Sequence, residues 1–157
     1  MPPPQTLSRI EAIPRQHLAA QRKISGVIFS DLGQAASFMA LAWVQQALRK
    51  SLGFAPFPAT LNVRPKTSED LQVWGDIRRD MKGVPLPPAG GEFCSARLFP
   101  VDIHRAEGGP NPIARGAVLL PEVTGYPEDK IEIVAAVRLK DEFGVQDGDQ
   151  LTLEFVN

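Results

Sequence analysis

The sequence predicts a mainly β domain, a small barrel of short strands with one main helix. Several short apolar stretches have the length and alternation of strands, whereas only one stretch carries a sustained helical period. At 157 residues and 43% hydrophobic content, the chain has the size of one domain with a single core. Short strands around one core indicate a barrel.

The folded unit is expected to begin near Lys23. Residues 1–22 contain four prolines and little periodicity, which favours a flexible N-terminal arm, so the barrel domain is assigned to residues 23–157. The first strand is expected to follow at once, with apolar residues on both faces. It should end at a turn over Ser30–Gly33.

The main helix is predicted over Ala35–Leu52. Its apolar residues recur at steps of three and four, while polar residues fall mostly on the other side. Those apolar positions are Phe38, Leu41, Val44, Leu48 and Leu52. Gly53 follows directly, where a helix is expected to stop.

The next stretch, LGFAPFPATLNV at Leu52–Val63, is predicted to be a strand. Side chains two positions apart share a face, so Leu61 and Val63 would face the core while Thr60 and Asn62 face a cavity. A hydroxyl and an amide oxygen suit a hard cation such as Mg2+, which is usually held by a few oxygen ligands plus phosphates. Taken alone, the pattern also fits an ordinary edge strand with outward polar residues.

The second half of the chain alternates connectors with short strands. Residues 66–82 are charged and would form one short helix or a surface excursion, and residues 84–91 are expected to be a turn-rich connector. A break is expected at Pro100. The predicted strands are Phe93–Ile103, Ala114–Leu120, Ile131–Ala135 and Gln150–Val156, and a short helix is predicted over Val137–Phe143.

Charge and cysteine content narrow the function classes. Lys and Arg number 17 against 18 Asp and Glu, so a net charge of -1 provides no field that attracts nucleic acid or an anionic membrane. A single cysteine cannot form an internal disulfide, which fits a reducing compartment. The sequence shows neither a membrane span nor a secretion signal. We therefore expect a cytoplasmic protein without nucleic-acid or membrane partners, and a monomer is favoured.

Four segments of the chain resemble the archaeal CTP-dependent riboflavin kinases. They are ISGVIFSDLGQAASFM at Ile24–Met39, LGFAPFPATLNV at Leu52–Val63, FCSARLFPVDI at Phe93–Ile103 and VLLPEVTGYPEDKIEIVAAVRLKDEFGVQDGD at Val118–Asp149. Two pieces are the most specific. Ala59–Asn62 looks like the family's G-T-L-N signature, and Ile131–Lys140 looks like its I-E-I-I-A-P-x-x-L-R signature.

The resemblance implies a six-stranded Greek-key barrel of the cradle-loop type. It also implies transfer of the γ-phosphate of CTP to the 5′-hydroxyl of riboflavin, which yields FMN and CDP. Mg2+ would be the cofactor, and riboflavin and CTP would be the partners. Such a site suits phosphoryl transfer, because that reaction needs in-line positioning and neutralised phosphate charge more than covalent chemistry from the protein.

The resemblance also assigns roles by position. Thr60 and Asn62 would be the Mg2+ ligands. Thr124 and Glu132 would contact the flavin, and Glu132 is the candidate catalytic residue because it would align the attacking hydroxyl. Judged from its strand alone, Glu132 would more often be a solvated outward residue. The nucleotide would be contacted by Asp31, Leu32, Gly33, Gln34, Ala35, Ala36, Val137, Arg138, Leu139 and Lys140.

Several positions depart from the family's pattern, and most lie where phosphate would bind. Asp31 and Ala35 stand where the family has glycines, and Gln34 stands where it has a glutamate. Ala59 and Lys140 replace a glycine and an arginine. A carboxylate and an added methyl group would hinder a triphosphate, so an alternative function is a barrel that binds flavin or nucleotide without turnover. A DNA-binding regulator is a third hypothesis, which the net charge of -1 disfavours.

Overall fold

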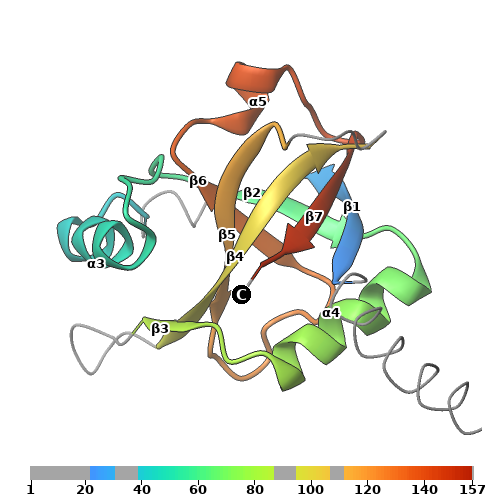
Figure 1. The fold of residues 1–157 in the computed structure, drawn as a ribbon, viewed down its shortest axis with the longest axis horizontal. Coiled ribbons are helices and arrows are strands. Elements are labelled where there is room, and N and C mark those ends of the chain that lie inside the picture. The colour runs from blue at the N-terminus through green and yellow to red at the C-terminus, as the bar shows by residue number, and fades with distance from the viewer. Residues whose placement is uncertain (1–21, 31–38, 87–94, 107–111, 157) are drawn as a thin grey trace, which may run out of the picture.

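The computed structural model describes residues 22–30, 39–86, 95–106 and 112–156. Within these residues the chain forms seven strands and three α-helices (Figure 1). In chain order they are β1 (Lys23–Phe29), α3 (Ala42–Leu52), β2 (Leu61–Pro65), α4 (Ser68–Asp80), β3 (Val84–Leu86), β4 (Ala96–Arg105), β5 (Ala114–Pro121), β6 (Ile131–Ala135), α5 (Leu139–Phe143) and β7 (Gln150–Phe155). All of the predicted arm except Arg22 lies outside the described residues.

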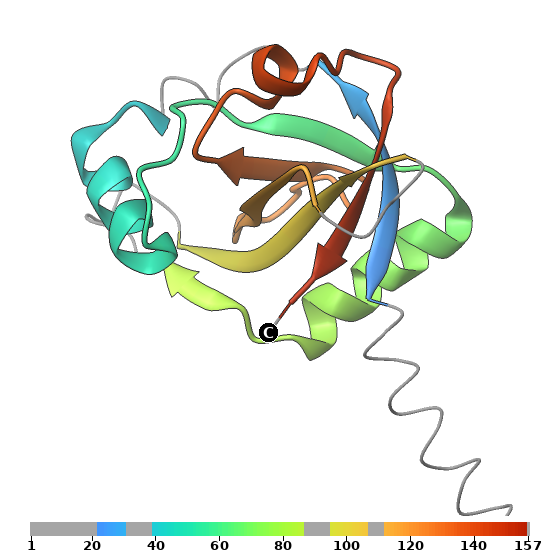
Figure 2. The ribbon, with the colours of Figure 1, turned by 45° about the horizontal axis from the view of Figure 1, so that its top comes forward.

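Six strands close into a barrel, which confirms the predicted fold class. The strand order is β4-β5-β6-β2-β1-β7, every neighbouring pair is antiparallel, and β7 pairs back onto β4 (Figures 1 and 2). Closure leaves no open edge in the barrel wall. Outside the ring, β3 is an additional strand that pairs with β4.

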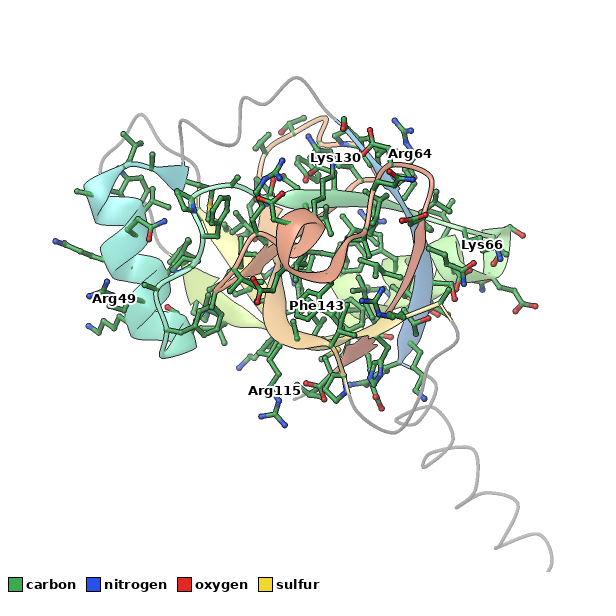
Figure 3. All side chains as sticks on the ribbon, turned by 90° about the horizontal axis from the view of Figure 1, so that it is seen from above. Arg49, Arg64, Lys66, Arg115, Lys130 and Phe143 are labelled. Atoms are coloured by element: carbon green, nitrogen blue, oxygen red, sulfur yellow. The ribbon has the colours of Figure 1, made fainter. Side chains whose placement is uncertain are left out.

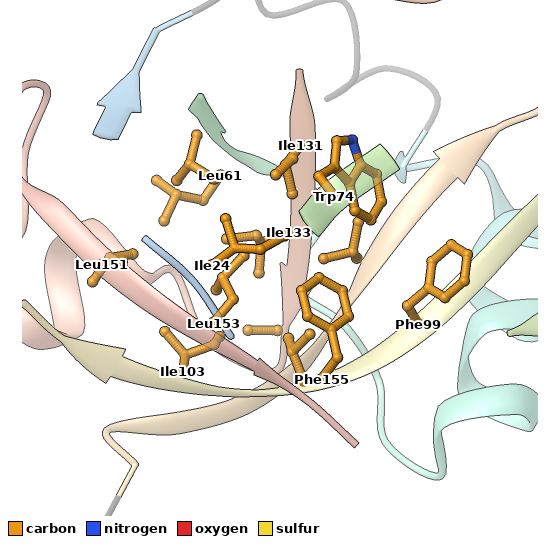
Figure 4. Close-up of a cluster of buried hydrophobic side chains, with 14 of the residues drawn as sticks. Ile24, Leu61, Trp74, Phe99, Ile103, Ile131, Ile133, Leu151, Leu153 and Phe155 are labelled. Atoms are coloured by element: carbon orange, nitrogen blue, oxygen red, sulfur yellow. The ribbon is translucent and has the colours of Figure 1, made fainter. Parts of the chain in front are cut away.

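Alternate residues of the strands fill the barrel. In β7, Leu151, Leu153 and Phe155 are buried while the residues between them are only partly buried. The same alternation places Leu61 of β2 in the core, and Val63 with it, as predicted. Figure 4 shows Leu61, Leu151, Leu153 and Phe155 in one cluster of buried side chains. The residues between these positions therefore face the outside of the barrel wall.

The charged stretch after β2 forms a full helix, α4, which decides between the two alternatives left by the sequence. The Thr67 hydroxyl accepts from the N–H of Asp70, and the Asp70 carboxylate accepts from the N–H of Thr67. The sequence analysis did not use this capping box, although its residues mark the helix start. The helix packs against β1 and β2 and inserts Trp74 into the core, with ring centres 5.8 Å from Phe99 and 5.9 Å from Phe155.

The main predicted helix is interrupted at residues 40–41, after the helical residue Met39. A turn at residues 40–41 precedes α3, whose first residue is Ala42, and residues 35–38 lie outside the described part. Its end is confirmed, since Gly53 has a φ of 82° and donates its N–H to the carbonyl of Arg49. In the described ranges, no helix combines the length and apolarity that crossing a membrane requires.

A second apolar cluster lies on the outer face of β4, β5 and β6, where α3 and β3 cover it (Figure 2). Its buried members are Met39, Val44, Leu48, Leu86, Ala96, Leu98, Ala117, Leu119 and Val134. Because the barrel core fills the other side, all five residues of β6 are buried. Strand β6 is therefore the most enclosed part of the wall, and it carries Glu132.

The predicted strand over Leu52–Val63 is wrong for most of its length, because β2 begins only at Leu61. The two prolines in this stretch lack the N–H that strand pairing needs, so the chain reaches β2 as a loop. Phe57 anchors the loop beside β6 by donating its N–H to the carbonyl of Ala135 at 2.7 Å. Thr60 is therefore a loop residue directly before the strand.

Two details of the second half also differ from expectation. The connector predicted at 84–91 contains β3, which pairs with β4 in the register Val84 to Leu98. The expected break at Pro100 does not occur. Pro100 lies between residues 96–98 of β4, which pair with β3, and residues 101–105, which pair with β7. Its missing N–H therefore falls where the strand on one side of β4 changes from β3 to β7.

Candidate functional site

Two buried polar side chains stand next to each other on the outer face of the barrel wall. Asn62 of β2 and Glu132 of β6 are directly opposite in the antiparallel ladder, so their side chains share one face. Asn62 is 9% exposed and Glu132 is 5% exposed. Judged from its strand alone, Glu132 was expected to be solvated; that expectation is wrong, because the side chain points outward but is buried. Buried polar groups need partners, because burying them without hydrogen bonds is costly.

The carboxylate of Glu132 has two hydroxyl partners. Thr60 Oγ1 donates to Oε1 at 3.3 Å, and the Tyr126 hydroxyl donates to Oε2. Each hydroxyl has one hydrogen to donate, whereas an ionised carboxylate accepts at both oxygens. The carboxylate is thus held from two sides, by the loop before β2 and by the connection between β5 and β6.

The amide oxygen of Asn62 lacks such a partner. Asn62 Oδ1 is buried and has no hydrogen-bond partner among the described residues. An unsatisfied buried acceptor costs about 1–3 kcal/mol, so its presence points to a ligand that completes it. Thr60 gives its hydrogen to Glu132, which leaves the lone pairs of its oxygen available. We call Thr60, Asn62, Tyr126 and Glu132 the polar cluster.

The polar cluster fits a hard cation that takes most of its ligands from water and substrate. Mg2+ prefers oxygen ligands, and proteins often hold it through one or two side chains plus phosphates. In the part of the chain that the structure describes, no group of three or more His, Cys, Asp and Glu side chains could hold a metal. A cation here would therefore depend on Thr60 and Asn62 together with a bound nucleotide.

The predicted flavin contacts are split between a strand and a turn. Glu132 lies on β6, while Thr124 is exposed in the β5–β6 connection beside Gly125, which has a φ of 84°. Tyr126 belongs to the same connection and reaches back to Glu132. The sequence analysis missed Tyr126, although it is the one tyrosine of the chain and lies within the segment that resembles the family.

The predicted nucleotide segment at Val137–Lys140 leads into the short helix α5. Val137 is exposed, and Arg138 pairs with Asp141 at 2.6 Å. Leu139 packs into the barrel core and is 4% exposed, so its side chain is not open to a ligand. One apolar side chain thus anchors a segment whose other side chains face outward.

Lys140 belongs to an exposed group of side chains at the end of β1. Its ammonium donates to Asp147 Oδ1 at 2.9 Å and to Ser30 Oγ at 3.3 Å, and Ser30 donates to Asp147 Oδ2. The Ser30 hydroxyl and then Lys140 hold the pKa of Asp147 below its ordinary value of 3.8. We call these three residues the loop cluster. The predicted nucleotide loop, residues 31–36, directly follows Ser30 and lies outside the described residues.

A further cation lies on the same face as Asn62. Arg64 is two residues along β2, with its guanidinium 3.9 Å from the ring centre of Phe29 and 3.9 Å from the carboxylate of Asp129. Figure 3 shows Arg64 and Lys130 at the same edge of the barrel. Arg64, which the sequence analysis also missed, places positive charge on the same face of β2 as Asn62.

A cavity of about 350 Å³ lies along α4. It is lined by Arg22, Glu69, Gln72, Val73, Asp76, Ile77, Asp80 and Met81. These residues include none of the predicted site residues and none of the polar cluster. The candidate site is therefore the polar cluster, flanked by the loop cluster.

Comparisons with known proteins identify the family to which the chain belongs. A family model described as "CTP-dep_RFKase: Domain of unknown function DUF120" matches residues 28–155. A riboflavin kinase of Aeropyrum pernix is 35% identical over 133 residues, which cover 84% of this chain and 94% of that protein. A riboflavin kinase of Methanobrevibacter smithii is 29% identical over 136 residues, which cover 85% of this chain and 99% of that protein.

Some relatives are longer than this chain. A riboflavin kinase of Pyrobaculum arsenaticum is 34% identical over 138 residues, so the match covers 86% of this chain and 61% of that protein. The chain thus spans about three fifths of the length of that relative. The family match covers most of the chain and includes the whole polar cluster and loop cluster. The chain therefore belongs to the CTP-dependent riboflavin kinase family, as its resemblance predicted.

Proposed function

We propose that this chain transfers the γ-phosphate of CTP to the 5′-hydroxyl of riboflavin, giving FMN and CDP. The ribityl oxygen forms a bond to the γ-phosphorus, the bond to the β-phosphate oxygen breaks, and the hydroxyl proton is released. The observation that carries the proposal is the polar cluster. In it, Asn62 Oδ1 has no hydrogen-bond partner among the described residues and the Thr60 oxygen keeps its lone pairs, both beside the buried carboxylate of Glu132. The relatives' names support riboflavin, and the family description supports CTP.

Glu132 is assigned to the flavin. Thr60 and Tyr126 occupy one acceptor site on each carboxylate oxygen, and an ionised carboxylate has about four such sites, so a ribityl hydroxyl can still donate to it. We assign Glu132 to alignment of the attacking oxygen, because positioning is what phosphoryl transfer asks of a protein. Thr124, on the adjacent turn, would contact the same flavin.

Thr60 and Asn62 are assigned to Mg2+ bound together with the nucleotide. The cation would neutralise charge on the phosphates, which is a main requirement of phosphoryl transfer. The unpaired Asn62 Oδ1 supports this assignment, since a cation would satisfy an acceptor that has no protein donor. Arg64 supplies further positive charge on the same face of β2.

The nucleotide is assigned to residues 31–36 and to Val137–Lys140. The position of Lys140 supports this, because its ammonium lies beside Ser30, the residue directly before that loop. A phosphate group would compete with the Asp147 carboxylate for the ammonium, since both are anionic acceptors. Binding of nucleotide would therefore open the loop cluster.

Direct turnover tests the proposal. The protein is incubated with riboflavin and Mg2+, separately with CTP, ATP, GTP or UTP, and FMN is resolved from riboflavin by chromatography. We expect FMN formation with CTP as the preferred donor and none when divalent cations are chelated. Preference for another donor would overturn the assignment of CTP. The absence of FMN with every donor would overturn the kinase function.

The altered nucleotide loop favours one alternative, a barrel that binds flavin or nucleotide without turnover. Asp31 adds a carboxylate and Ala35 adds a methyl group where the resembling family has glycine. Quenching of riboflavin fluorescence without FMN formation would support this alternative. The double variant Asp31→Gly, Ala35→Gly then tests the cause, since recovered FMN formation would show that these two side chains exclude the triphosphate.

A further inference from the structure

We propose that Tyr126 is a positioning residue that couples the flavin-binding turn to the cation-binding residues through Glu132. The inference rests on the proposed function, because it takes Thr124 as a flavin contact and Thr60 as a cation ligand. It adds a residue and a form of regulation, in which binding of one substrate prepares the site for the other.

The first link joins the turn to the carboxylate. Tyr126 lies two positions after Thr124 in the β5–β6 connection, and its ring packs against the barrel core. Its N–H bonds back to the carbonyl of Val123, and its hydroxyl donates to Glu132 Oε2. A ligand that fixes this turn at Thr124 therefore also fixes the hydroxyl that orients Glu132.

The second link joins the carboxylate to the cation ligand. Thr60 Oγ1 carries one hydrogen, and it gives that hydrogen to Glu132 Oε1. This choice turns the lone pairs of the Thr60 oxygen away from Glu132, which is the orientation that a cation requires. If the carboxylate moved, the Thr60 hydrogen would be free to turn toward the cation site and oppose binding.

The two links act in both directions. Thermodynamic linkage requires that, if flavin binding strengthens binding of the Mg2+ nucleotide complex, the complex strengthens flavin binding by the same factor. The coupling depends on the hydroxyl of Tyr126 and not on its ring. The substitution Tyr126→Phe keeps the ring in the core and removes the hydroxyl, so it isolates this one contact.

Calorimetry measures the coupling directly. The affinity for riboflavin is determined with and without Mg2+ and CDP, which cannot donate a γ-phosphate, in the unmodified protein, in Tyr126→Phe and in Ser95→Ala. Ser95→Ala is the matched control, since it removes a hydroxyl that donates to Glu122 at 3.0 Å at the start of the same connection.

We expect Mg2+ with CDP to tighten riboflavin binding about tenfold in the unmodified protein and in Ser95→Ala, within the usual range of such couplings. In Tyr126→Phe each ligand should still bind alone, but the coupling factor should fall to about one. An equal coupling factor in Tyr126→Phe and the unmodified protein would overturn the inference, as would no coupling in either.

A ligand-free measurement separates this inference from the proposed function. Because Tyr126 is the one tyrosine of the chain, labelling tyrosine with carbon-13 at Cζ gives a single NMR signal. We expect Thr60→Val to shift this signal through Glu132, and Ser95→Ala to leave it in place. An unchanged chemical shift of the Tyr126 signal in Thr60→Val would overturn the link between Tyr126 and Thr60 through Glu132, whether or not the protein binds riboflavin. Failure of all ligand binding with a shifted signal would instead count against the proposed function alone.

Kinetics provide a third readout, if turnover is established. A merely structural loss would lower stability and leave the catalytic parameters of the folded protein unchanged. Loss of the coupling should raise the KM for CTP at saturating riboflavin about tenfold, the factor that calorimetry measures, and loss of the hydrogen bond that orients Glu132 should also lower kcat. An unchanged kcat in folded Tyr126→Phe would contradict the proposal.

Discussion

The polar cluster and the loop cluster hold similar chemical groups in opposite environments. In the polar cluster, Asn62 and Glu132 are nearly buried on paired strands whose alternate residues fill the barrel core. In the loop cluster, the side chain of Lys140 is 26% exposed and that of Asp147 is 50% exposed. The first arrangement is fixed by the strand register, whereas the second is held by surface hydrogen bonds between the end of β1, α5 and the turn before β7, which water can replace.

The difference in burial predicts how strongly each cluster would contribute to ligand binding. In the buried polar cluster, a polar contact acts in a low dielectric, so the loss of one partner changes the binding free energy strongly and salt has little influence on it. At the surface, an ion pair contributes little and is screened by salt. We expect substitutions in the polar cluster to change binding strongly, and those in the loop cluster to change it modestly and in a salt-dependent manner.

The largest effect is expected for Asn62→Ala. Removing the unpaired oxygen should weaken Mg2+-dependent nucleotide binding by about 100-fold or more, comparable to the upper range for altered metal environments. The thermal midpoint should stay within about 4 °C, because the lost amide had an unsatisfied acceptor whose burial was itself costly. Calorimetric titration with CDP and Mg2+ and thermal unfolding measure the two quantities. An unchanged nucleotide affinity would remove Asn62 from the site.

The second-largest effect is expected for Glu132→Gln. The amide has one acceptor oxygen, so Thr60 or Tyr126 must turn to accept from its nitrogen, and the charge-assisted hydrogen bonds are lost. The free energy of unfolding should fall by about 1–3 kcal/mol, and FMN formation should fall at least tenfold. Urea unfolding checks the first value.

Glu122→Gln is the matched control for this substitution. Glu122 also accepts a hydroxyl hydrogen bond, from Ser95 at 3.0 Å, but its side chain is 45% exposed. Its substitution should change the free energy of unfolding by less than about 0.5 kcal/mol. Equal losses in the two variants would contradict the contrast between buried and exposed carboxylates.

A smaller effect is expected for Lys140→Ala. The KM for CTP should rise about three- to tenfold at low salt, and the difference from the unmodified protein should shrink at high salt because the ammonium is partly exposed. Steady-state kinetics across a salt series measure it. Arg115→Ala removes a comparable surface cation, paired with Asp102 at 3.2 Å, and should leave the KM unchanged. The same KM in Lys140→Ala and Arg115→Ala would exclude Lys140 from the nucleotide site.

The smallest effect is expected for Asp147→Asn and depends on pH. The pKa of Asp147 is lowered in the folded protein, so its ionised form stabilises the fold above the ordinary value of 3.8. This contribution is lost as the pH falls through the folded-state pKa. The thermal midpoint of Asp147→Asn should therefore lie slightly below that of the unmodified protein at neutral pH and converge with it in acid. A difference that persists below the folded-state pKa would show that another interaction was lost.

Much of the wall was predictable because strand alternation is a local property. Apolar residues at every second position in Gln150–Val156 and Ile131–Ala135 predicted strands that the structure has within one residue. The errors fall where local pattern and backbone chemistry disagree. Prolines turned the stretch before Leu61 into a loop, and the capping box at Thr67 started a helix that the charged composition had obscured.

By itself, the sequence determined the family, the barrel, and the candidate roles of Thr60, Asn62 and Glu132, because signature residues and alternation can be recognised along the chain. Only the tertiary structure decided that Glu132 is buried and that its carboxylate joins Thr60 to Tyr126. Thr60 and Glu132 are 72 positions apart, so their contact exists only through the register between β2 and β6 and the enclosure of that wall. Burial and hydrogen-bond partners depend on which strands meet, and no short stretch of sequence contains that information.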